Sequence, residues 1–378
     1  MIQAVEASPV IARTQRAMKA AGLDAVIAVS PENVTYAIGT DFVMSDLFMY
    51  VEPRNTFTAC LIPVDGEPTL TVWRQEFELA KQQSWVRDVR YWPMFEGTAT
   101  LLAEVAREKG LERARIGVEK DYLSVSTFEQ LRASLPNVTF EASEAVFAKA
   151  RTVKTEYEIE QLRRVAYVTS KAISLAWERA RVGDLERDVA ADITNHVMRF
   201  GAHPYVFNMG SGPNSALGHR WGDDRRLQSG DIIHADAKGR IRGYWSDVSR
   251  NCVVGTPDPH QIDIYARLVA IHDRIVDMLK PGLEAREVYE FSRQVYKREG
   301  INVEPRLIGH GIGTALHEAP LLEPDVTDVL EEGMVVTVEP THYEPGVRYH
   351  YENMVLVTAR GGEVLSNHGL GPLVVVNS

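Results

Sequence analysis

Four carboxylates and one histidine in the second half of the chain stand where apolar, strand-like segments begin or end. Asp236 and Glu339 each end such a segment, Glu352 opens one, and Asp247 follows Asp236 by eleven residues. His310 lies between glycines. A carboxylate in such a position is costly unless it is paired or binds a cation. Oxygen and imidazole ligands together suit two divalent metal ions such as Mn²⁺, Co²⁺, Fe²⁺ or Zn²⁺.

The segments around these residues predict how they come together. Gly239 and Gly243 fit a hairpin that would bring the first two carboxylates side by side. His310 has a glycine on either side, and small neighbours leave room for an imidazole that binds a ligand. His234 precedes Asp236 by two residues on the same predicted strand, so both are expected on one face. His234 then either packs there or supports the ligands from behind.

Helical patterns lie upstream of these strands and are repeated. One helix is predicted over residues 156–181, where Gly183 ends it, and a second over residues 185–200. His196 and His272 fall on helical patterns and are expected to be ordinary helix residues. Four residue pairs share one offset of 99 residues: Gly183 and Gly282, Arg187 and Arg286, Val189 and Val288, and Gly201 and Gly300. An ancient duplication explains this offset, and so does chance recurrence of a glycine before a helix.

The first 150 residues alternate helix-like and strand-like patterns, which favours an α/β sheet. Strands are predicted at residues 24–29, 56–62, 69–73 and 115–119, and helices at residues 12–21, 76–84, 99–109 and 126–133. A polar, basic stretch near residues 150–155 predicts a boundary between domains 1–150 and 151–378. The chain shows no phosphate-binding loop, because Gly210-Ser211-Gly212 lacks the Lys-Ser/Thr pair that such a loop needs.

The composition narrows the class of protein. The 378 residues include 41 Lys and Arg against 52 Asp and Glu, a formal net charge of −11. Non-specific nucleic-acid binding needs a basic surface, so we expect no nucleic-acid partner. No apolar run approaches the ~18 residues of a membrane span, and no signal sequence opens the chain, so no membrane association is expected. With only two cysteines, we expect a reduced, cytoplasmic setting and a metal held without thiolates.

Several motifs together resemble the pita-bread metallopeptidase family, peptidase family M24, and within it the branch of prolidase, aminopeptidase P and creatinase. The matching motifs are the two aspartates with Gly-Tyr-x-Ser-Asp-x-Ser-Arg at 243–250, Gly-His-Gly-Ile-Gly at 309–313, His-Glu-x-Pro at 317–320, Gly-Met-Val-x-Thr-Val-Glu-Pro at 333–340, and Glu352 heading a Met-Val-Leu-Val-Thr strand. Ser211-Gly212-Pro213-Asn214 leading to His219 is also similar. The resemblance implies a pita-bread catalytic domain with pseudo-twofold duplication at 151–378 and a creatinase-like α/β domain at 1–150.

The resemblance also implies a role for each ligand. Asp236 and Glu352 would each contact one metal ion or bridge two, Asp247 would clamp one ion with both oxygens, and His310 would bind the other. Glu339 would bridge the ions or bind near the nucleophile, and it could take the proton of the nucleophile as general base. Two ions ~3.5–4 Å apart lower the pKa of a shared water, so that a bridging hydroxide exists at neutral pH. Mn²⁺ is the first expectation, with Co²⁺, Zn²⁺ and Fe²⁺ as alternatives.

His219 and His317 match family histidines that contact the substrate and stabilise the tetrahedral intermediate. Relatives in this branch are commonly dimers in which one subunit's N-terminal domain reaches the other's active site. We therefore expect a homodimer, with the apolar and aromatic segment 41–54 as the reaching element.

Three departures from the family pattern bear on the substrate. Lys238 stands at the glycine of the usual Asp-x-Gly, and a long cation beside metal ligands must either turn away or meet an anion. Thr341 follows Glu339-Pro340 where a glycine is usual. His350 stands where proline-directed members carry an arginine, and Arg348 is the nearest one. His350 cannot bind a carboxylate through two parallel hydrogen bonds as arginine does, so both residues are weak substrate candidates.

These features leave three functions open. The complete ligand set favours a dinuclear metal hydrolase that cleaves Xaa-Pro bonds in small peptides, as a dipeptidase or an aminopeptidase. The changes at Lys238 and His350 allow a small-molecule hydrolase or lyase instead, similar to creatinase, ectoine hydrolase or dimethylsulfoniopropionate lyase. A catalytically silent binding module would be marked by lost ligands, and all five are present.

Overall fold

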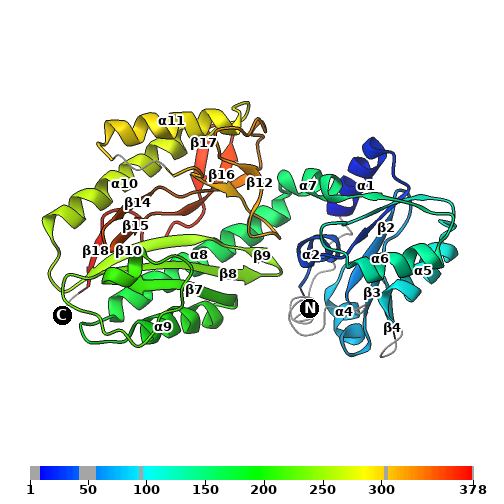
Figure 1. Cartoon of the computed structure of the whole chain (residues 1–378), viewed down its shortest axis with the longest axis horizontal. Helices are drawn as coiled ribbons and strands as arrows, with labels where there is room; N and C mark the ends of the chain where they lie inside the picture. The colour runs from blue at the N-terminus through cyan, green and yellow to red at the C-terminus, as the bar shows by residue number, and fades with distance from the viewer. Residues whose placement is uncertain (1–8, 42–56, 93–96, 302–304, 377–378) are drawn as a thin grey trace. The chain divides into compact units, whose positions relative to one another are not determined.

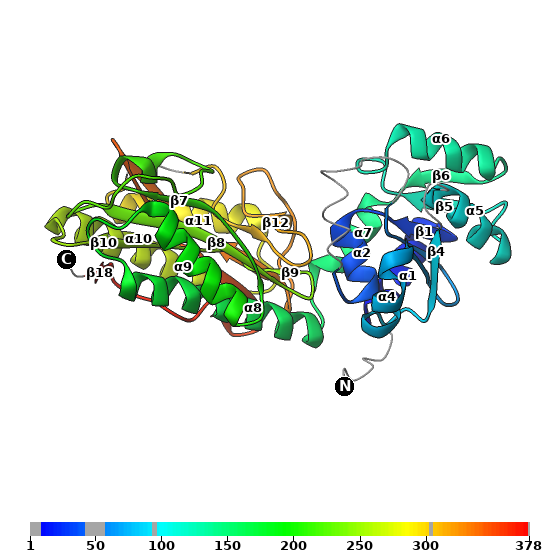
Figure 2. The same ribbon diagram turned by 90° about the horizontal axis from the view of Figure 1, so that it is seen from below.

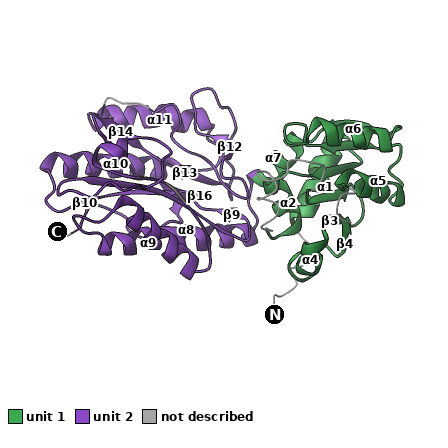
Figure 3. Ribbon diagram, turned by 60° about the horizontal axis from the view of Figure 1, so that its bottom comes forward, with its two compact units in different colours: residues 1–151 green, residues 152–378 purple. Residues whose placement is uncertain are grey.

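The computed structural model describes residues 9–41, 57–92, 97–301 and 305–376. The chain divides into two compact units, residues 1–151 and 152–378, shown in green and purple in Figure 3. Of the segment 41–54, only Asp41 lies within the described residues. In the part of the chain that is described, no helix combines the length and the apolar character that a membrane crossing requires.

The first unit is built on a six-stranded mixed sheet (Figure 1). Strands β1 and β2 are antiparallel, as are β2 and β3, while β3 and β4, β1 and β5, and β5 and β6 are parallel. The order across the sheet is β4 (Asp88–Trp92), β3 (Thr69–Trp73), β2 (Ala59–Pro63), β1 (Ala25–Ala28), β5 (Arg115–Val118) and β6 (Thr139–Ala142).

Helices cover both faces of this sheet, which is why its central strands are apolar throughout. Val26 and Cys60 face a core that holds Met18 and Phe147, whereas the neighbouring Ile27 faces the opposite core. The first core is covered by α1 (Pro9–Ala21), α2 (Pro31–Ile38), α4 (Phe77–Gln83, after the short helix η1 at Arg74–Glu76) and α7 (Glu144–Thr152), and the second by α5 (Thr98–Glu108) and α6 (Val125–Ser134).

The four helices and four strands predicted in this half are all present, and two further α-helices and two further strands are not among those predicted. Two of these, β4 and β6, are the edge strands of the sheet and are only partly buried, so they lack a continuous apolar run. Helix α2 is short, and its clearest sequence signal is at its start. The Ser30 hydroxyl accepts a hydrogen bond from the Asn33 amide there, and a proline occupies the first turn of the helix. Helix α7 is the fourth.

The second unit has two five-stranded sheets and a two-stranded ribbon. The first sheet has the order β18 (Val374–Val376), β10 (Val248–Val254), β8 (Ile232–Ile241) and β7 (His203–Ser211), and β9 (Tyr244–Trp245) pairs with β8. The second has the order β12 (Glu318–Leu321), β11 (His310–Gly311), β13 (Val335–Val338), β16 (Asn353–Thr358) and β17 (Gly361–Val364). The ribbon is β14 (Thr341–Glu344) with β15 (Val347–His350).

Two pairs of helices enclose these sheets. Figures 1 and 2 show α8 and α9 on one side of the strands and α10 and α11 on the other. Their bounds are α8 Glu156–Arg179, α9 Glu186–Arg199, α10 Pro259–Met278 and α11 Ala285–Arg298, with a short helix η2 at Gly212–Ala216. The strands therefore lie between helical layers, and each helix pair has its own core.

The two halves of this unit repeat one arrangement, which favours duplication over chance. Helix α11 begins and ends 99 residues after α9. The glycines before them have matching left-handed conformations, with φ of 95° at Gly183 and 92° at Gly282. The Gly183 amide donates to the carbonyl of Leu227 at 2.9 Å, and the Gly282 amide to that of Leu330 at 2.8 Å. Backbone pairing, which chance recurrence of glycines would not reproduce, is thus shared by both copies.

Candidate metal centre

A tight hairpin brings the first two predicted carboxylates together. Strands β8 and β9 are joined at Arg242 and Gly243, which both have positive φ (49° and 81°), the conformation that a two-residue hairpin turn needs. In the following ladder, Ser249 of β10 lies opposite Asp236 of β8. Asp247 directly precedes β10, so both carboxylates lie where the ladder between β8 and β10 begins, although β8 itself continues beyond Asp236 to Ile241.

The second sheet supplies the remaining predicted ligands. Glu339 directly follows β13, and His310 opens β11 beside it. Glu352 directly precedes β16, and its amide donates to the carbonyl of Ser249 on the first sheet at 3.1 Å. This bond joins the two sheets where their carboxylates meet.

All five predicted ligands converge there, with their side chains nearly excluded from solvent except for Glu339, whose side chain is 18% exposed. His310 Nε2 lies 3.7 Å from Glu339 Oε1 and 3.9 Å from Asp247 Oδ2. Three sets have ligand atoms within 4.8 Å of one another: Asp247 with His310 and His317, Asp236 with His350 and Glu352, and His310 with Glu339 and Glu352. The arrangement offers several ways to hold a divalent cation.

The glycines around His310 are required by close backbone packing. A Cβ atom added to Gly309 would lie 2.0 Å from the Thr337 carbonyl oxygen, and one on Gly311 would lie 2.4 Å from that of Ala319. No side chain fits at either position. The glycine-rich sequence lets three strand segments close around the imidazole.

Hydrogen bonds fix the proton of His310 on the nitrogen that faces away from the carboxylates. Its Nδ1 lies 3.0 Å from the carbonyl oxygen of Gly311, which can only accept, so Nδ1 carries the hydrogen. The lone pair of Nε2 therefore points at Glu339 and Asp247, as in metal-binding histidines. Burial, followed by the neighbouring His317, lowers the pKa of His310 to about 3, so the ring is neutral and able to bind a metal.

The anionic cluster has the electrostatics of a cation site. Burial raises the pKa of Glu339 to about 7, and the charge of Asp236 acts in the same direction. Burial and the neighbouring carboxylates also raise the pKa of Glu352 well above its usual range. Among the described residues, no side chain donates a hydrogen bond to the Glu352 carboxylate, whose oxygens are thus available to an ion. The donor set fits a hard or borderline divalent metal.

We expect the affinity of the metal-free protein for Mn²⁺ to rise as the pH increases through 7. Glu339, with a pKa of about 7, must lose its proton before both oxygens can bind an ion, whereas His310 is already neutral. Below that pKa, each proton displaced changes the affinity by about tenfold per pH unit. Calorimetric titration in buffers of different ionisation enthalpy measures both the affinity and the protons released. An affinity that stays constant across neutral pH, with no proton release, would contradict this electrostatic account.

Lys238 turns toward the cluster, which settles one of the alternatives left open by the sequence. Its ammonium donates to Asp236 Oδ1 and lies 2.7 Å from Asp247 Oδ1, with 6% of the side chain exposed. Burial alone would lower the pKa of Lys238, but the charges of Asp236 and Asp247 outweigh burial and raise it, so the group stays cationic. The same ammonium outweighs burial at Asp236 and lowers the pKa of that carboxyl.

The two weaker substrate candidates lie behind and beside the cluster. His350 is buried, with Nε2 3.6 Å from Glu339 Oε2, and its Nδ1 lies 3.0 Å from Arg348 Nη2. His234, expected on the face of Asp236, contacts Ser249 Oγ at 3.0 Å and His350 Nδ1 at 3.4 Å. His234 therefore supports the site from behind.

The two histidines predicted to contact substrate are both exposed at this site. The ring centroid of His317 lies 3.9 Å from that of His310. Burial lowers the pKa of His317, and the charges of Lys238 and His219 act in the same direction. His219 is one of two non-glycine residues in the described chain with positive φ, at 50°. His196 and His272 are helix residues, on α9 and α10.

Several positioning residues were not singled out from the sequence. Asn208 on β7 donates to Asp236 Oδ2 at 2.9 Å, and Thr337 Oγ1 lies 3.5 Å from Glu339 Oε1. The Asn251 side chain accepts from the amide of His350 at 2.6 Å and so holds β15 beside β10.

Arg250, the last residue of the motif at 243–250, positions the backbone and side chain beside Glu352, and we expect Arg250→Met to weaken both the fold and the candidate metal site. Its guanidinium donates to the Glu352 carbonyl and to Asn353 Oδ1, each at 2.6 Å. Leaving such buried acceptors unpaired costs about 1–3 kcal/mol each, and loss of support behind a ligand lowers metal affinity by roughly 10- to 100-fold. Chemical denaturation and metal titration measure the two effects.

Arg163→Met is the matched control, because the Arg163–Glu363 pair is exposed and worth about 0–1 kcal/mol. Unchanged metal affinity in a folded Arg250→Met protein would show that Arg250 does not position Glu352.

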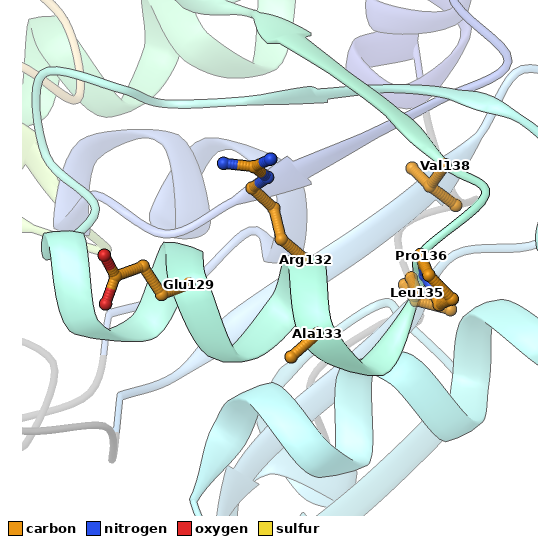
Figure 4. A pocket seen from close by; sticks show the side chains of 6 residues that line it. All are labelled: Glu129, Arg132, Ala133, Leu135, Pro136 and Val138. Atoms are coloured by element: carbon orange, nitrogen blue, oxygen red, sulfur yellow. The ribbon is translucent and has the colours of Figure 1, made fainter.

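A surface pocket on the first unit carries none of this chemistry. It is lined by Glu129, Arg132, Ala133, Leu135, Pro136 and Val138 at the end of α6 (Figure 4). Figure 4 shows one acid and one base well separated along the helix, without a converging set of polar groups. We assign it no function.

Two family models match the chain. Residues 160–359 match Metallopeptidase family M24, and residues 11–153 match the Creatinase/Prolidase N-terminal domain. A relative in Pyrococcus furiosus, named Xaa-Pro dipeptidase, is 32% identical over 351 residues, covering 91% of this chain and 93% of the relative.

Solved structures show the same similarity. The prolidase from Pyrococcus furiosus has a TM-score of 0.78 at 30% identity, covering 93% of this chain and 99% of that one. Dipeptidase PepE from Mycobacterium ulcerans has a TM-score of 0.82 at 26% identity, with complete coverage of both chains. The predicted pita-bread architecture with a creatinase-like first domain is thereby confirmed.

Proposed function

Since the chain belongs to metallopeptidase family M24, we propose that it is a metal-dependent dipeptidase that hydrolyses the bond between an amino acid and a following proline. The observation that carries this proposal is the convergence of Asp247, His310, Glu339 and Glu352 in one buried, anionic centre. Relatives named Xaa-Pro dipeptidase, similar over nearly the whole chain, support the choice of substrate. We likewise propose residues 1–150 as the creatinase-like domain and 151–378 as the catalytic one.

The residues of the centre take distinct roles in this proposal. Asp236, Asp247, His310, Glu339 and Glu352 are the candidate ligands, and a bound divalent ion would lower the pKa of water and polarise the scissile carbonyl. Glu339, whose carboxylate lies 3.7 Å from His310 Nε2, takes the proton of the attacking water as general base. The proton then reaches the leaving proline nitrogen. His317 and His219 face the site from its exposed side and donate to the oxygen that gains charge.

Recognition of a dipeptide needs a cation for its terminal carboxylate, and we assign this role to Arg348. Its Nε is buried with no hydrogen-bond partner among the described residues, and its Nη2 bonds to His350 Nδ1. Arg348 lies on β15 opposite Tyr343, and its guanidinium lies 5.5 Å from the centroid of that ring. In this proposal, Arg348 replaces the arginine that is usual at position 350. It lies two residues earlier on β15 and therefore on the same face of the strand.

For the ion, we propose Mn²⁺ ahead of Co²⁺, Zn²⁺ and Fe²⁺, because carboxylate oxygens dominate the donor set. The family resemblance implies two such ions. The position of Lys238 between two of the candidate ligands affects how many ions can bind. We further propose a cytoplasmic homodimer that acts on small peptides. Both cysteines, Cys60 and Cys252, are free and buried, which is compatible with a reducing compartment. Light scattering on the purified protein tests the dimer.

A substrate panel tests the function. The Mn²⁺-loaded protein is assayed with Xaa-Pro dipeptides, Xaa-Pro-Xaa tripeptides and dipeptides without proline. We expect turnover of the Xaa-Pro dipeptides, and preference for tripeptides would identify an aminopeptidase instead. Absence of turnover of every Xaa-Pro peptide would refute the proposal.

One observation favours a second candidate, a small-molecule hydrolase or lyase. His350 stands where related peptidases carry an arginine, whose guanidinium can bind a carboxylate through two hydrogen bonds. The ring of His350 is neutral, because burial lowers its pKa well below the usual range. A substrate without a terminal carboxylate would have no need of that fork. Creatine, ectoine and dimethylsulfoniopropionate in the same panel separate this candidate from the first.

A further inference from the structure

The ammonium of Lys238 lies between the two carboxylates that would hold one of the two expected ions. It donates to Asp236 Oδ1 and is 2.7 Å from Asp247 Oδ1. Lys238 follows Asp236 by two residues on β8 and so shares its face. Metal–oxygen bonds of about 2.0–2.2 Å would put an ion shared by these carboxylates in nearly the same space as the ammonium.

Each oxygen of Asp236 already accepts a hydrogen bond from the protein in this arrangement. Lys238 donates to Oδ1, and Asn208 Nδ2 donates to Oδ2 at 2.9 Å. Asp236 is only 7% exposed, so its hydrogen-bond partners come from the protein rather than from solvent. Both partners belong to the protein itself, and the anion is satisfied without an added cation.

A second set of ligand atoms, Asp236 with His350 and Glu352, is also closed to a metal. Arg348 can only donate, so the 3.0 Å contact makes His350 Nδ1 the acceptor. A neutral imidazole then carries its hydrogen on Nε2, which faces Glu339 and Glu352 at 3.6 and 4.0 Å. A nitrogen that bears hydrogen cannot bind a metal. His310 is the opposite case, because its Nδ1 donates to Gly311 and its Nε2 is free.

The two sets that stay open both contain His310. One adds Asp247 and His317, and the other adds Glu339 and Glu352. Asp247 Oδ2 is the oxygen nearest His310, on the side away from the one that Lys238 approaches. Both remaining sets of ligand atoms can therefore be used by a single ion bound at His310 Nε2.

We propose that this protein holds one divalent metal ion, bound by His310, Glu339, Glu352 and Asp247, and that the Lys238 ammonium replaces the second ion. The inference rests on the proposed metal-dependent function and changes its stoichiometry. Lys238 acts as a positioning residue that neutralises Asp236 and holds Asp247 in place. The carboxylate cluster keeps a second positive charge, but one that is covalently attached and cannot bind water or substrate oxygen.

Metal stoichiometry tests this inference without any assay of activity. The full chain is stripped with a chelator, reloaded with excess Mn²⁺, freed of unbound ion and analysed by mass spectrometry for metal per chain. Electron paramagnetic resonance then distinguishes an isolated Mn²⁺ from two ions coupled through shared carboxylates. We expect one uncoupled ion in the wild type and two coupled ions in Lys238→Ala and Lys238→Gly.

Arg240→Ala is the matched control. Arg240 lies on the same face of β8 two residues further on, is also buried, and packs over the Trp245 ring at 5.1 Å. Removing this cation should leave one ion per chain.

Two ions in the wild type would overturn the inference and leave the proposed function standing. No ion in the folded wild type would overturn both. One ion in a folded Lys238→Ala protein would show that Lys238 does not take the place of the second. The wild-type measurement decides the stoichiometry even if neither Lys238 variant folds.

Discussion

Glu339→Gln is expected to reduce turnover of Xaa-Pro dipeptides by about 10³-fold or more, because one change removes both a ligand and the general base. The amide keeps the shape of the side chain but neither binds a cation through two anionic oxygens nor accepts a proton near neutral pH. Burial raises the pKa of Glu339 to about 7, so its ionised form is costly in the metal-free fold. We therefore expect the metal-free variant to melt no lower than the metal-free wild type. Steady-state kinetics with saturating Mn²⁺ and thermal melts measure the two effects.

Glu344→Gln is the matched control for this change. Glu344 lies on β14, is partly exposed and contacts His260 and His342 rather than the cluster. Its removal should alter kcat/KM by no more than about twofold, as for most surface substitutions. Full activity in a folded Glu339→Gln protein would show that the general base lies elsewhere.

His310→Ala is expected to abolish stable metal binding, with affinity for Mn²⁺ falling on the order of 10²- to 10³-fold. Both sets of ligand atoms that stay open to an ion include this imidazole, and its Nε2 faces Glu339 at 3.7 Å and Asp247 at 3.9 Å. With one ion per chain, no second site retains metal when His310 is lost. Isothermal titration and metal content after desalting measure the loss.

His196→Ala controls for the removal of a histidine. His196 lies on α9 with its ring stacked near Phe200, at a centroid distance of 6.1 Å. Its replacement should leave metal content unchanged. Retention of a bound ion by His310→Ala would place the metal on Asp236 and Glu352 instead, against the hydrogen bonding of both His350 and Lys238.

Much of the fold follows from local patterns in the sequence. Helices α8 and α9 begin and end within two residues of their predicted limits, because an apolar face repeats along each and a glycine follows. The offset of 99 residues correctly pointed to two copies of one arrangement. Strands β4 and β6 were not predicted, because an edge strand buries too little of its surface to require a run of apolar residues.

The types and order of the candidate metal ligands were also readable, since a buried carboxylate on an apolar segment is costly unless it is paired or binds a cation. Asn208, Thr337 and Asn251 were not, because a polar residue on a strand finds its partner only through the register with a neighbouring strand. The register pairs β7 with β8, so that Asn208 lies opposite Asp236.

The sequence by itself determined which residues could bind a metal, and the two-residue period of a strand placed Lys238 on the face of Asp236. Only the tertiary structure decided where the long side chain of Lys238 ends. It ends between Asp236 and Asp247 because the hairpin closes the second carboxylate over it. His350 is decided in the same way, since Arg348 fixes its tautomer across space. Charge and hydrogen-bond direction depend on neighbours brought together by folding, and the Gly311 carbonyl leaves the Nε2 of His310 free to accept an ion.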